Sequence, residues 1–585
     1  MYTFVREREG DTIRFQRLTR TCRRTEPSSS ATMGVETASA GGAAAVPAEA
    51  CEAETLWTAE GHAVGAPPAP VREAAPEDGA SAALSSPVLE FFAGATVMVT
   101  GATGFVGKAL VEKLLRCCPD VRAVYILIRP KKGMDVESRH QELLQHPVFE
   151  RLRAEQGPGV FGKVRPVAGD VSLPHLGLSE ADRRRLQAEV NIVFHSAATV
   201  RFNEGLAAAV SLNTVGTQRV MRLCKEMLAI KSLVHVSTAY SNADKREVRE
   251  VVYAPPADPE AVIKLVKSLP EDAMPGLASA LMGKRHPNTY TLTKAMAEWI
   301  VQEEADDIPC AIVRPSIVTA ALRDPVPGWV DNVCGITGIM MEIGRGTIRS
   351  IICEEDYIVD LIPVDLVVNT LITAAWRTGT HHANTVQVYN CTSGQLNPVH
   401  WHEFGRLTQN QAVETPTKYV QWYPGFSFRT NRAVHKFCEI FFHFLPAHVV
   451  DLLIRAQGGK PIMVKIAKRF KMAAKTGEFF SLHEWDFESS NMRALMKDMD
   501  CVTDRETFDV DVSHMEWKPY VADYMMGIRK YVLKDGAESL PAARRKLNRL
   551  WWAHRITQGV TLLALLRLAF LASSFLLDNV LCLSR

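Results

Sequence analysis

The sequence predicts an α/β fold, in which a doubly wound parallel sheet of the Rossmann type is followed by a mainly helical C-terminal domain and a C-terminal hydrophobic helix. Short runs rich in Val and Ile begin at residue 95 and alternate with amphipathic stretches of helix length, as expected of a parallel sheet buried on both faces. A glycine-rich turn follows the first run. After about residue 395 this alternation ends, and helical segments dominate up to residue 533.

The elements follow one another in a regular order along the chain. The expected strands are 95–100, 124–128, 163–170, 191–198, 232–237 and 310–315. The expected helices between and after them include 108–118, 213–227, 290–305 and 362–376. An insertion at 244–288 and a Gly-rich apolar stretch at 328–352 interrupt this order.

Composition and charge exclude several classes of protein. The 585 residues are 47% hydrophobic and 23% charged, which is too apolar for a disordered chain and too long for one ordinary core. The 67 Lys and Arg nearly balance the 65 Asp and Glu, so no nucleic-acid partner is expected. The twelve Cys form no C-x-x-C pair, so we expect free thiols, no disulfide framework and no metal site.

The leader, residues 1–87, has an Arg-rich start and an Ala/Pro/Glu-rich continuation. Neither part has apolar periodicity, so we expect it to be disordered. An organelle transit peptide is the alternative, although the acids among the first 26 residues disagree with that composition. Met33 is an alternative start of the chain.

The glycine-rich turn reads TGATGFVGK and opens a helix. Glycines there permit a tight turn and close approach of the backbone to a pyrophosphate, and the free amides of the helix N-terminus bind the anion. Because the turn lies between a strand and an amphipathic helix, we expect a bound dinucleotide rather than a merely structural turn. The expected contacts are Thr100, Gly101, Thr103, Gly104, Phe105, Val106 and Gly107.

Basic residues indicate which dinucleotide binds. Arg129 and Lys132 follow the second strand, where an NAD site usually carries an acid for the ribose hydroxyl. Their charges suit a 2′-phosphate, so NADPH is the expected cofactor, with a solvated basic loop as the alternative. After the third strand, Asp170 and Val171 are expected beside the adenine, unless Asp170 serves only a turn.

The fourth strand ends in small residues. Ser196 and Ala197 leave room for the cofactor backbone and are expected to contact it. His195, which precedes them, is expected to be a residue of the strand end rather than a base.

Tyr290 and Lys294 are four positions apart, hence on one face of a helix. A phenol has a pKa of about 10, and a nearby cation favours its ionised form. We therefore expect Tyr290 to be the catalytic acid, with Lys294 lowering its pKa and reaching the nicotinamide ribose.

Two further polar residues are predicted at the same site. Thr238 follows the fifth strand, whose C-terminal end faces the ligand crevice of an open sheet, and is chosen over Ser237 as the second donor to the substrate oxygen. Asn213, near the start of a helix, is expected either to hold a proton-relay water or to cap that helix.

Five motifs now carry a family resemblance. Extended short-chain dehydrogenases/reductases have similar segments, and the particular residues resemble fatty acyl-CoA reductases: TGATGFVGK, HSAATVRFNE, LNTVGTQ, VSTAYSN and YTLTKAMAE. The resemblance covers about 88–535, because FFHFLPAHVVDLL and later segments are similar to that family's C-terminal domain. It implies an NADP-binding reductase domain at 88–395 and a helical domain at 396–535. The leader departs from the family.

The resemblance also implies an activity, the reduction of long-chain acyl-CoA to a primary alcohol with two NADPH through an aldehyde that is not released. Hydride would attack the thioester, Thr238 and Tyr290 would stabilise the oxygen, and no nucleophilic Cys is needed. The first reduction is expected to be the slower one.

Selection among acyl chains of different length requires an apolar channel. Its candidate linings are 261–283 and 328–352, which includes Met340 and Met341, with ordinary core packing as the alternative. Basic residues near these segments are weaker candidates for the CoA phosphates: Lys284, Arg285, Arg345 and Arg349.

The C-terminal region 536–585 predicts a basic linker and a membrane helix at 556–577, long enough to cross about 30 Å of hydrocarbon. Arg567 at its centre costs roughly 2.5–3.5 kcal/mol, which the many Leu and Phe offset. We expect the helix to span a peroxisomal or endoplasmic-reticulum membrane with the catalytic domain facing the cytosol. Segment 437–453 is expected to be an interfacial or core helical pair.

Two other functions remain open at this stage. One is an NADP-dependent steroid, nucleotide-sugar or other lipid oxidoreductase of the same fold. The other is a non-catalytic membrane-tethered NADPH-binding protein, against which the presence of both Tyr290 and Lys294 argues. A homo-oligomer is compatible with either.

Overall fold

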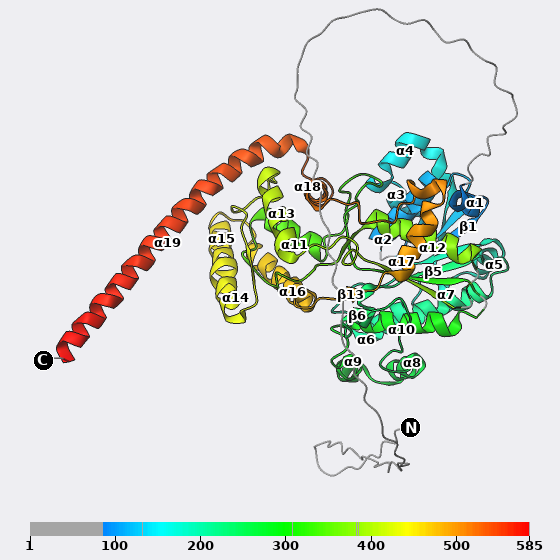
Figure 1. Cartoon of the computed structure of the whole chain (residues 1–585), viewed down its shortest axis with the longest axis horizontal. Coiled ribbons are helices and arrows are strands. Elements are labelled where there is room, and N and C mark those ends of the chain that lie inside the picture. The colour runs from blue at the N-terminus through cyan, green and yellow to red at the C-terminus, as the bar shows by residue number, and fades with distance from the viewer. Residues whose placement is uncertain (1–85, 131–132, 307, 382, 384, 584–585) are drawn as a thin grey trace, which may run out of the picture. The chain divides into compact units, whose positions relative to one another are not determined.

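The protein is seen here as a computed structural model, which describes residues 86–130, 133–306, 308–381, 383 and 385–583 (Figure 1). The predicted leader therefore lies almost entirely outside the described residues. Within them, seven parallel strands form one sheet in the order β11-β7-β5-β4-β1-β2-β3. This arrangement confirms the predicted doubly wound sheet.

The strands agree closely with the apolar runs. They are β1 (Thr96–Thr100), β2 (Ala123–Ile128), β3 (Val164–Ala168), β4 (Ile192–His195), β5 (Ser232–Val236), β7 (Cys310–Pro315) and β11 (Gln387–Cys391). The sequence analysis did not expect β11, which pairs with β7 at the sheet edge. Asn390 makes the segment polar, and its amide groups bond outside the sheet, to Val248 and Glu250.

Helices cover both faces of the sheet. The main helices are α2 (Phe105–Cys117), α5 (Glu180–Glu189), α7 (Val215–Lys225), α10 (Thr289–Glu304) and α12 (Val364–Thr380). Alternate strand residues belong to two separate apolar clusters: Val97 and Val99 pack with α2 and α12, whereas Met98 packs with α5 and α7. A sheet with a core on each face results, as the Val-rich and Ile-rich strands predicted.

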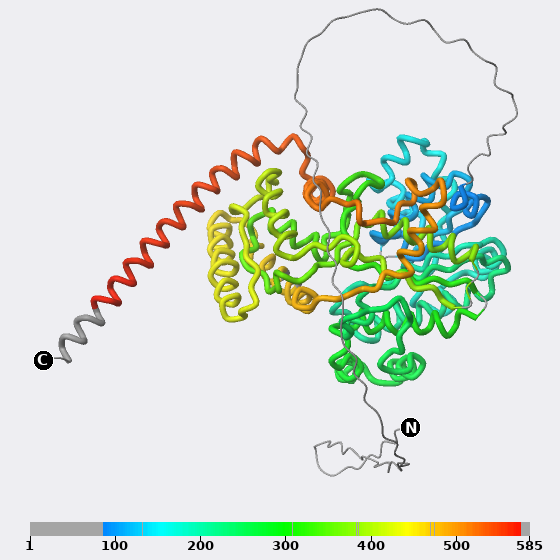
Figure 2. The backbone as a smooth tube through the Cα atoms, in the orientation of Figure 1, coloured from blue at the N-terminus to red at the C-terminus, as the bar shows by residue number. Residues whose placement is uncertain are grey.

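The C-terminal region is mainly helical, as predicted. Its helices are α13 (Trp401–Glu414), α14 (Arg432–Cys438), α15 (Leu445–Ala456), α16 (Met463–Ser481), α17 (Ser490–Asp500) and α18 (Trp517–Gly527). Short strands tie it to the earlier part of the chain: β13 (Asp486–Phe487) pairs with β6 (Glu247–Val248), and β12 (Ser427–Arg429) pairs with β9 (Ser350–Ile352). Figure 2 follows the chain from α16 to β13.

The chain ends in α19 (Leu540–Leu583). Two helices of the described chain are long and apolar enough to cross a membrane: Arg432–Ala456 and Ala537–Ser574. The second contains most of the predicted span 556–577, and its apolar side chains are exposed, as Leu563 and Phe570 illustrate.

Candidate active site

The glycine-rich turn fits a dinucleotide because backbones approach closely around it. Gly101 has φ +76°, and a Cβ there would lie 2.7 Å from the Ala197 nitrogen. A Cβ at Gly107 would lie 2.3 Å from the Gly101 carbonyl oxygen. Any residue other than glycine at these two positions would therefore collide with the neighbouring backbone.

Helix α2 begins directly at this turn. Gly104 is its N-cap and offers no side-chain cap, so the first amides, those of Phe105, Val106 and Gly107, have no intrahelical acceptor. Such amides suit a phosphate. Thr103, half-buried in the turn, lies beside them.

Thr100 is fully buried and bonded to the protein itself. Its hydroxyl lies 2.7 Å from Nδ1 of His195 and accepts from the Ala197 amide at 3.2 Å. The Ser196 amide donates to the Thr100 carbonyl at 3.2 Å. Thr100 thus positions the small residues at the end of β4, and His195 is a buried residue of the strand end, as predicted.

The other predicted cofactor residues lie at the ends of β2 and β3. Arg129 is exposed, whereas Lys132 lies outside the described residues. The Asp170 carboxylate accepts from the Ser172 amide at 2.9 Å and the Ser172 hydroxyl at 2.8 Å, so it does stabilise a turn. Val171 is buried.

Tyr290, in the first turn of α10, and Thr238, just after β5, lie close together. Thr238 lies two positions after Val236, the last residue of β5, and its hydroxyl accepts from the Tyr240 amide at 3.3 Å. The same side chain lies close enough to the Tyr290 phenol to lower its pKa. The site therefore brings together the two groups predicted to bind the substrate oxygen.

Electrostatics at Tyr290 differ from the sequence expectation. Burial raises the pKa of Tyr290 to about 12, and the Glu298 carboxylate raises it too, whereas the Thr238 side chain lowers it. The prediction that Lys294 lowers this pKa is not borne out, because desolvation sets the direction of the shift and Lys294 is not among the groups that contribute to it. At neutral pH the phenol is protonated, which is the state a proton donor needs.

Lys294 is 2% exposed and lies one turn along α10 from Tyr290. Its ammonium donates to the Val236 carbonyl at 2.7 Å. Burial lowers the pKa of Lys294 to about 8, and the nearby Glu298 opposes that shift. The lysine is therefore held at the C-terminal end of β5, the edge at which ligands bind to open parallel sheets.

Asn213 does not cap a helix. It lies inside a π-helical segment, η4 (Val210–Thr214), between α6 (Leu206–Ala209) and α7. Its side chain accepts from the Thr199 amide at 2.8 Å and donates to the Thr293 hydroxyl at 3.0 Å. The capping alternative is thus corrected, because the helix runs on through this residue, and the relay role stays a prediction.

A buried ion pair beneath the site was not predicted from the sequence. The Arg314 guanidinium donates to both oxygens of Glu298, at 2.9 and 2.7 Å, with side chains 0% and 1% exposed. The Ser237 hydroxyl also donates to Glu298, so it is engaged there, which favours Thr238 as the second donor. The spacing of Tyr290, Lys294 and Glu298, four and eight positions along one helix face, was the available signal.

Three aromatic side chains, Phe202, Phe480 and Tyr240, form a chain of ring contacts beside Tyr290, which we call the aromatic wall. The Phe202 ring stacks on the Tyr290 ring at 5.7 Å, and Phe480 of α16 contacts Phe202 at 5.4 Å. Phe480 then contacts Tyr240 at 5.0 Å. The C-terminal helical region therefore contributes directly to the surroundings of the predicted catalytic residue.

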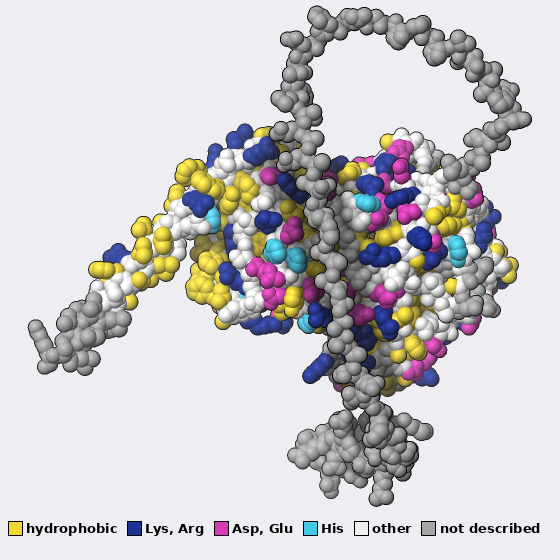
Figure 3. Space-filling view, viewed as in Figure 1, with side chains coloured by type: hydrophobic (Ala, Val, Ile, Leu, Met, Phe, Trp, Pro, Cys, Tyr) yellow, Lys and Arg dark blue, Asp and Glu magenta, His cyan; other side chains and the backbone are white. Residues whose placement is uncertain are grey.

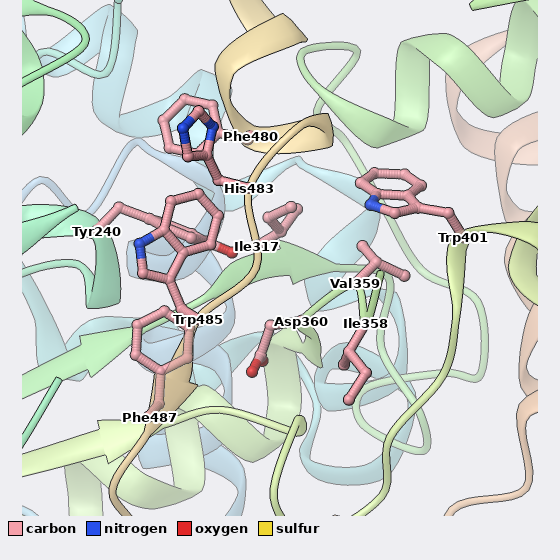
Figure 4. Close-up of a pocket in the computed structure, with 10 residues that line it drawn as sticks. All are labelled: Tyr240, Ile317, Ile358, Val359, Asp360, Trp401, Phe480, His483, Trp485 and Phe487. Carbon is pink, nitrogen blue, oxygen red and sulfur yellow. The ribbon is translucent and has the colours of Figure 1, made fainter. Parts of the chain in front are cut away.

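A small pocket lies behind this wall, with room for about one water molecule. Figure 4 shows the rings of Tyr240, Phe480 and Trp485 on one side and Trp401 on the other. Asp360 lines the pocket, and its carboxylate accepts from the amides of Ser393 and Gly394.

The predicted channel segments do not line this pocket. Met340 is fully buried in the main apolar cluster and Met341 packs against it, as the packing alternative expected. Arg345 pairs with Glu342 at 2.8 Å. Arg349 donates to the Gly425 carbonyl at 2.7 Å, and burial lowers its pKa to about 10.

Comparison with known proteins shows which family the chain resembles. Two family models described as Male sterility protein match residues 99–371 and 442–535. Fatty acyl-CoA reductase 1 of Rattus norvegicus is 39% identical over 461 residues, 79% of this chain and 89% of the relative. Fatty acyl-CoA reductase 1 of Xenopus laevis is 38% identical over 493 residues, 84% and 95% of the two chains.

Among solved structures, the reductase domain of a nonribosomal peptide synthetase from Mycobacterium tuberculosis has a TM-score of 0.51 at 19% identity. The matched region covers 77% of this chain and 94% of the chain of that reductase domain. This likeness shows the fold alone.

The parallel sheet, the glycine-rich turn and the Tyr290–Lys294 pair define a nicotinamide-dependent oxidoreductase of the Rossmann class. The similarity to fatty acyl-CoA reductases extends over most of this chain and of each relative, and it identifies the family within that class. The chain belongs to the fatty acyl-CoA reductase family. The predicted enzyme class, an alcohol-forming reductase, is confirmed, and the scaffold alternative is disfavoured.

Proposed function

We propose that this enzyme reduces long-chain fatty acyl-CoA to a primary alcohol with two NADPH, through an aldehyde that stays bound. One observation supports it most: the Tyr290 phenol lies beside the Thr238 side chain, which lowers its pKa, one helical turn from the buried Lys294. These residues lie at the carboxyl end of β5, and the glycine-rich turn follows the carboxyl end of β1, two strands away in the same parallel sheet. Family membership supports acyl-CoA over steroids and sugar nucleotides.

The residues then have distinct tasks. Bound NADPH supplies the hydride for the carbonyl carbon. Tyr290, protonated because its pKa is about 12, donates a proton to the carbonyl oxygen, and Thr238 donates a second hydrogen bond to it. Lys294 contributes positive charge beside the developing oxyanion and binds the ribose. Asn213 holds a relay water that reprotonates Tyr290.

Two reductions at one site give the alcohol. After the first, the proton on the substrate oxygen returns to Tyr290, the carbonyl forms again, the C–S bond breaks, and CoA leaves as the thiol after taking up a proton. The aldehyde then undergoes the same addition and keeps its proton. The stacked Phe202 excludes water from Tyr290 during both steps.

Charge at the adenosine end favours NADPH over NADH. Arg129 follows β2, and its exposed guanidinium suits a 2′-phosphate. Lys132 adds a second charge in the same loop. The first amides of α2 take the pyrophosphate.

The exposed apolar part of α19 anchors the enzyme in a peroxisomal or endoplasmic-reticulum membrane, with the catalytic domain in the cytosol. Side chains from Ile556 to Leu571 have no protein covering in the described chain. Basic residues and Trp552 precede them, as at a cytosolic interface. Carbonate extraction that released the full-length protein would refute the anchor.

One assay tests the reaction. Purified full-length enzyme is incubated with NADPH or NADH and acyl-CoAs of graded length, and the lipids are analysed. Alcohol formed with NADPH is expected, and Tyr290→Phe lowers its rate at least about 100-fold. No alcohol or aldehyde from any chain length contradicts the proposal, and free aldehyde appearing faster than alcohol contradicts the bound aldehyde and the slower first step.

A further inference from the structure

The helix formed by α14, η7 (Glu439–Phe444) and α15 carries an apolar face that the described protein leaves uncovered. Six of its large side chains are between 46% and 66% exposed: Phe437, Phe441, Phe442, Leu445, Leu452 and Leu453. We call them the apolar face of α14–α15. Figure 3 shows hydrophobic side chains gathered over these helices. A contiguous exposed group of this size marks an interaction site.

The opposite side of the same helix is fixed to the protein. Asp451 accepts from the amides of Ile462, Met463 and Val464 at 2.8 to 2.9 Å, at the start of α16. Glu439 pairs with Lys471 of α16 at 2.8 Å. A spanning helix would expose these carboxylates to hydrocarbon, so this helix cannot leave α16 to cross a bilayer.

Basic residues outnumber acidic ones around the face, although Arg432 pairs with Glu478 of α16 at 2.5 Å. Residues 432–475 contain nine Lys or Arg and only two acids, Glu439 and Asp451. Both acids are turned inward, 6% and 8% exposed. Lys465 and Lys468 on α16 are exposed. The surface presented to solvent in this region is therefore apolar and basic, which matches an anionic lipid surface.

We propose that the apolar face of α14–α15 lies in the interface of an anionic membrane, with its Phe and Leu side chains among the acyl chains and its lysines at the phosphates. This contact is separate from the α19 anchor. Helix α16 has 19 residues, hence a length of about 28 Å, and joins this face to Phe480 beside the active site. The apolar face and the aromatic wall are therefore linked through α16.

The test uses the full chain reconstituted in phosphatidylcholine vesicles with or without phosphatidylserine. A phosphatidylcholine with a photoreactive acyl chain labels residues in contact with hydrocarbon, and mass spectrometry maps them. Labelling is expected in 437–453 and, separately, in 556–574. Omitting phosphatidylserine lowers labelling of 437–453 about fivefold or more, because exposed lysines then lose their partners, and leaves 556–574 unchanged.

The variant Phe441→Asp/Leu452→Asp changes side chains that are 46% and 66% exposed, so folding is retained. It is expected to lower labelling of 437–453 at least about tenfold, with 556–574 and the melting temperature unchanged. Leu228→Asp, at a residue 83% exposed elsewhere, is the matched control and leaves both unchanged.

Three outcomes overturn the proposal: labelling confined to 556–574, labelling of 437–453 that the double variant does not lower, or cross-links from 437–453 to a second copy without lipid label. Labelling of 437–453 alone sustains this proposal and contradicts the α19 anchor.

Discussion

The carboxylate of Glu298 and the guanidinium of Arg314 form a two-point ion pair that is 1% and 0% exposed, directly below the helix face of Tyr290 and Lys294. The charge of Glu298 also contributes an upward shift to the pKa values of Tyr290 and Lys294, the two groups proposed to be catalytic. Its carboxylate is engaged by Arg314 and by the Ser237 hydroxyl. We therefore treat it as a positioning residue that acts through its charge.

Glu298→Gln is expected to lower the free energy of unfolding by about 3–5 kcal/mol, because Arg314 is left buried without its counter-charge. Loss of the negative charge also lowers the pKa of Lys294 further. The alkaline fall of kcat/KM then moves to lower pH. Denaturation and pH profiles measure the two effects. Glu303→Gln, an exposed acid on the same helix, is the control; an unmoved pH profile would mean that Glu298 is only structural.

The pH profile of the wild-type enzyme should carry the signature of Lys294. Its pKa is lowered to about 8 by burial, so the lysine is charged below that pH and neutral above it. We expect kcat/KM to fall as pH rises through about 8. Lys294→Arg, whose side chain stays charged, should remove this fall while lowering the maximal rate.

The matched variant is Lys267→Arg, at an exposed residue of α8 (Pro259–Ser268), which should keep the wild-type profile. Steady-state rates over the pH range make the comparison. An alkaline fall retained in Lys294→Arg would show that another group titrates.

The order of strands and helices could be predicted because buried parallel strands are continuous apolar runs. Strand β11 could not be predicted in this way, because it contains the polar Asn390. The hydrogen bonds that accommodate Asn390 go to Val248 and Glu250, which are distant in sequence. Tyr290, Lys294 and Thr238 could be chosen from local spacing and strand ends. Arg314 could not, because only the fold brings it to Glu298, and the aromatic wall needed the return of α16 to the sheet.

Arg129 provides a test of cofactor choice. Arg129→Ala is expected to raise the KM for NADPH roughly tenfold and to leave that for NADH unchanged, because only the 2′-phosphate loses a counter-charge. Steady-state kinetics with each cofactor measure this. Arg184→Ala, at an arginine whose side chain is 74% exposed on α5, is the control. Equal effects on both cofactors would contradict the assignment.

Substitution of Phe480 tests whether the C-terminal region supports catalysis. Its ring holds Phe202, which stacks on Tyr290 at 5.7 Å. Phe480→Ala removes that support, so Tyr290 is less well oriented, and kcat is expected to fall about tenfold with NADPH affinity unchanged. Phe480→Tyr keeps the ring and should restore most of the rate.

The control is Phe479→Ala, because Phe479 contacts Phe480 and His483 on the outer side of the wall. Single-turnover rates and NADPH titration by fluorescence separate an effect on orientation from an effect on cofactor binding. If Phe480→Ala and Phe479→Ala lower kcat equally, the wall acts only through general packing. If only Phe480→Ala lowers it, the contact chain from α16 through Phe202 to Tyr290 orients the proton donor.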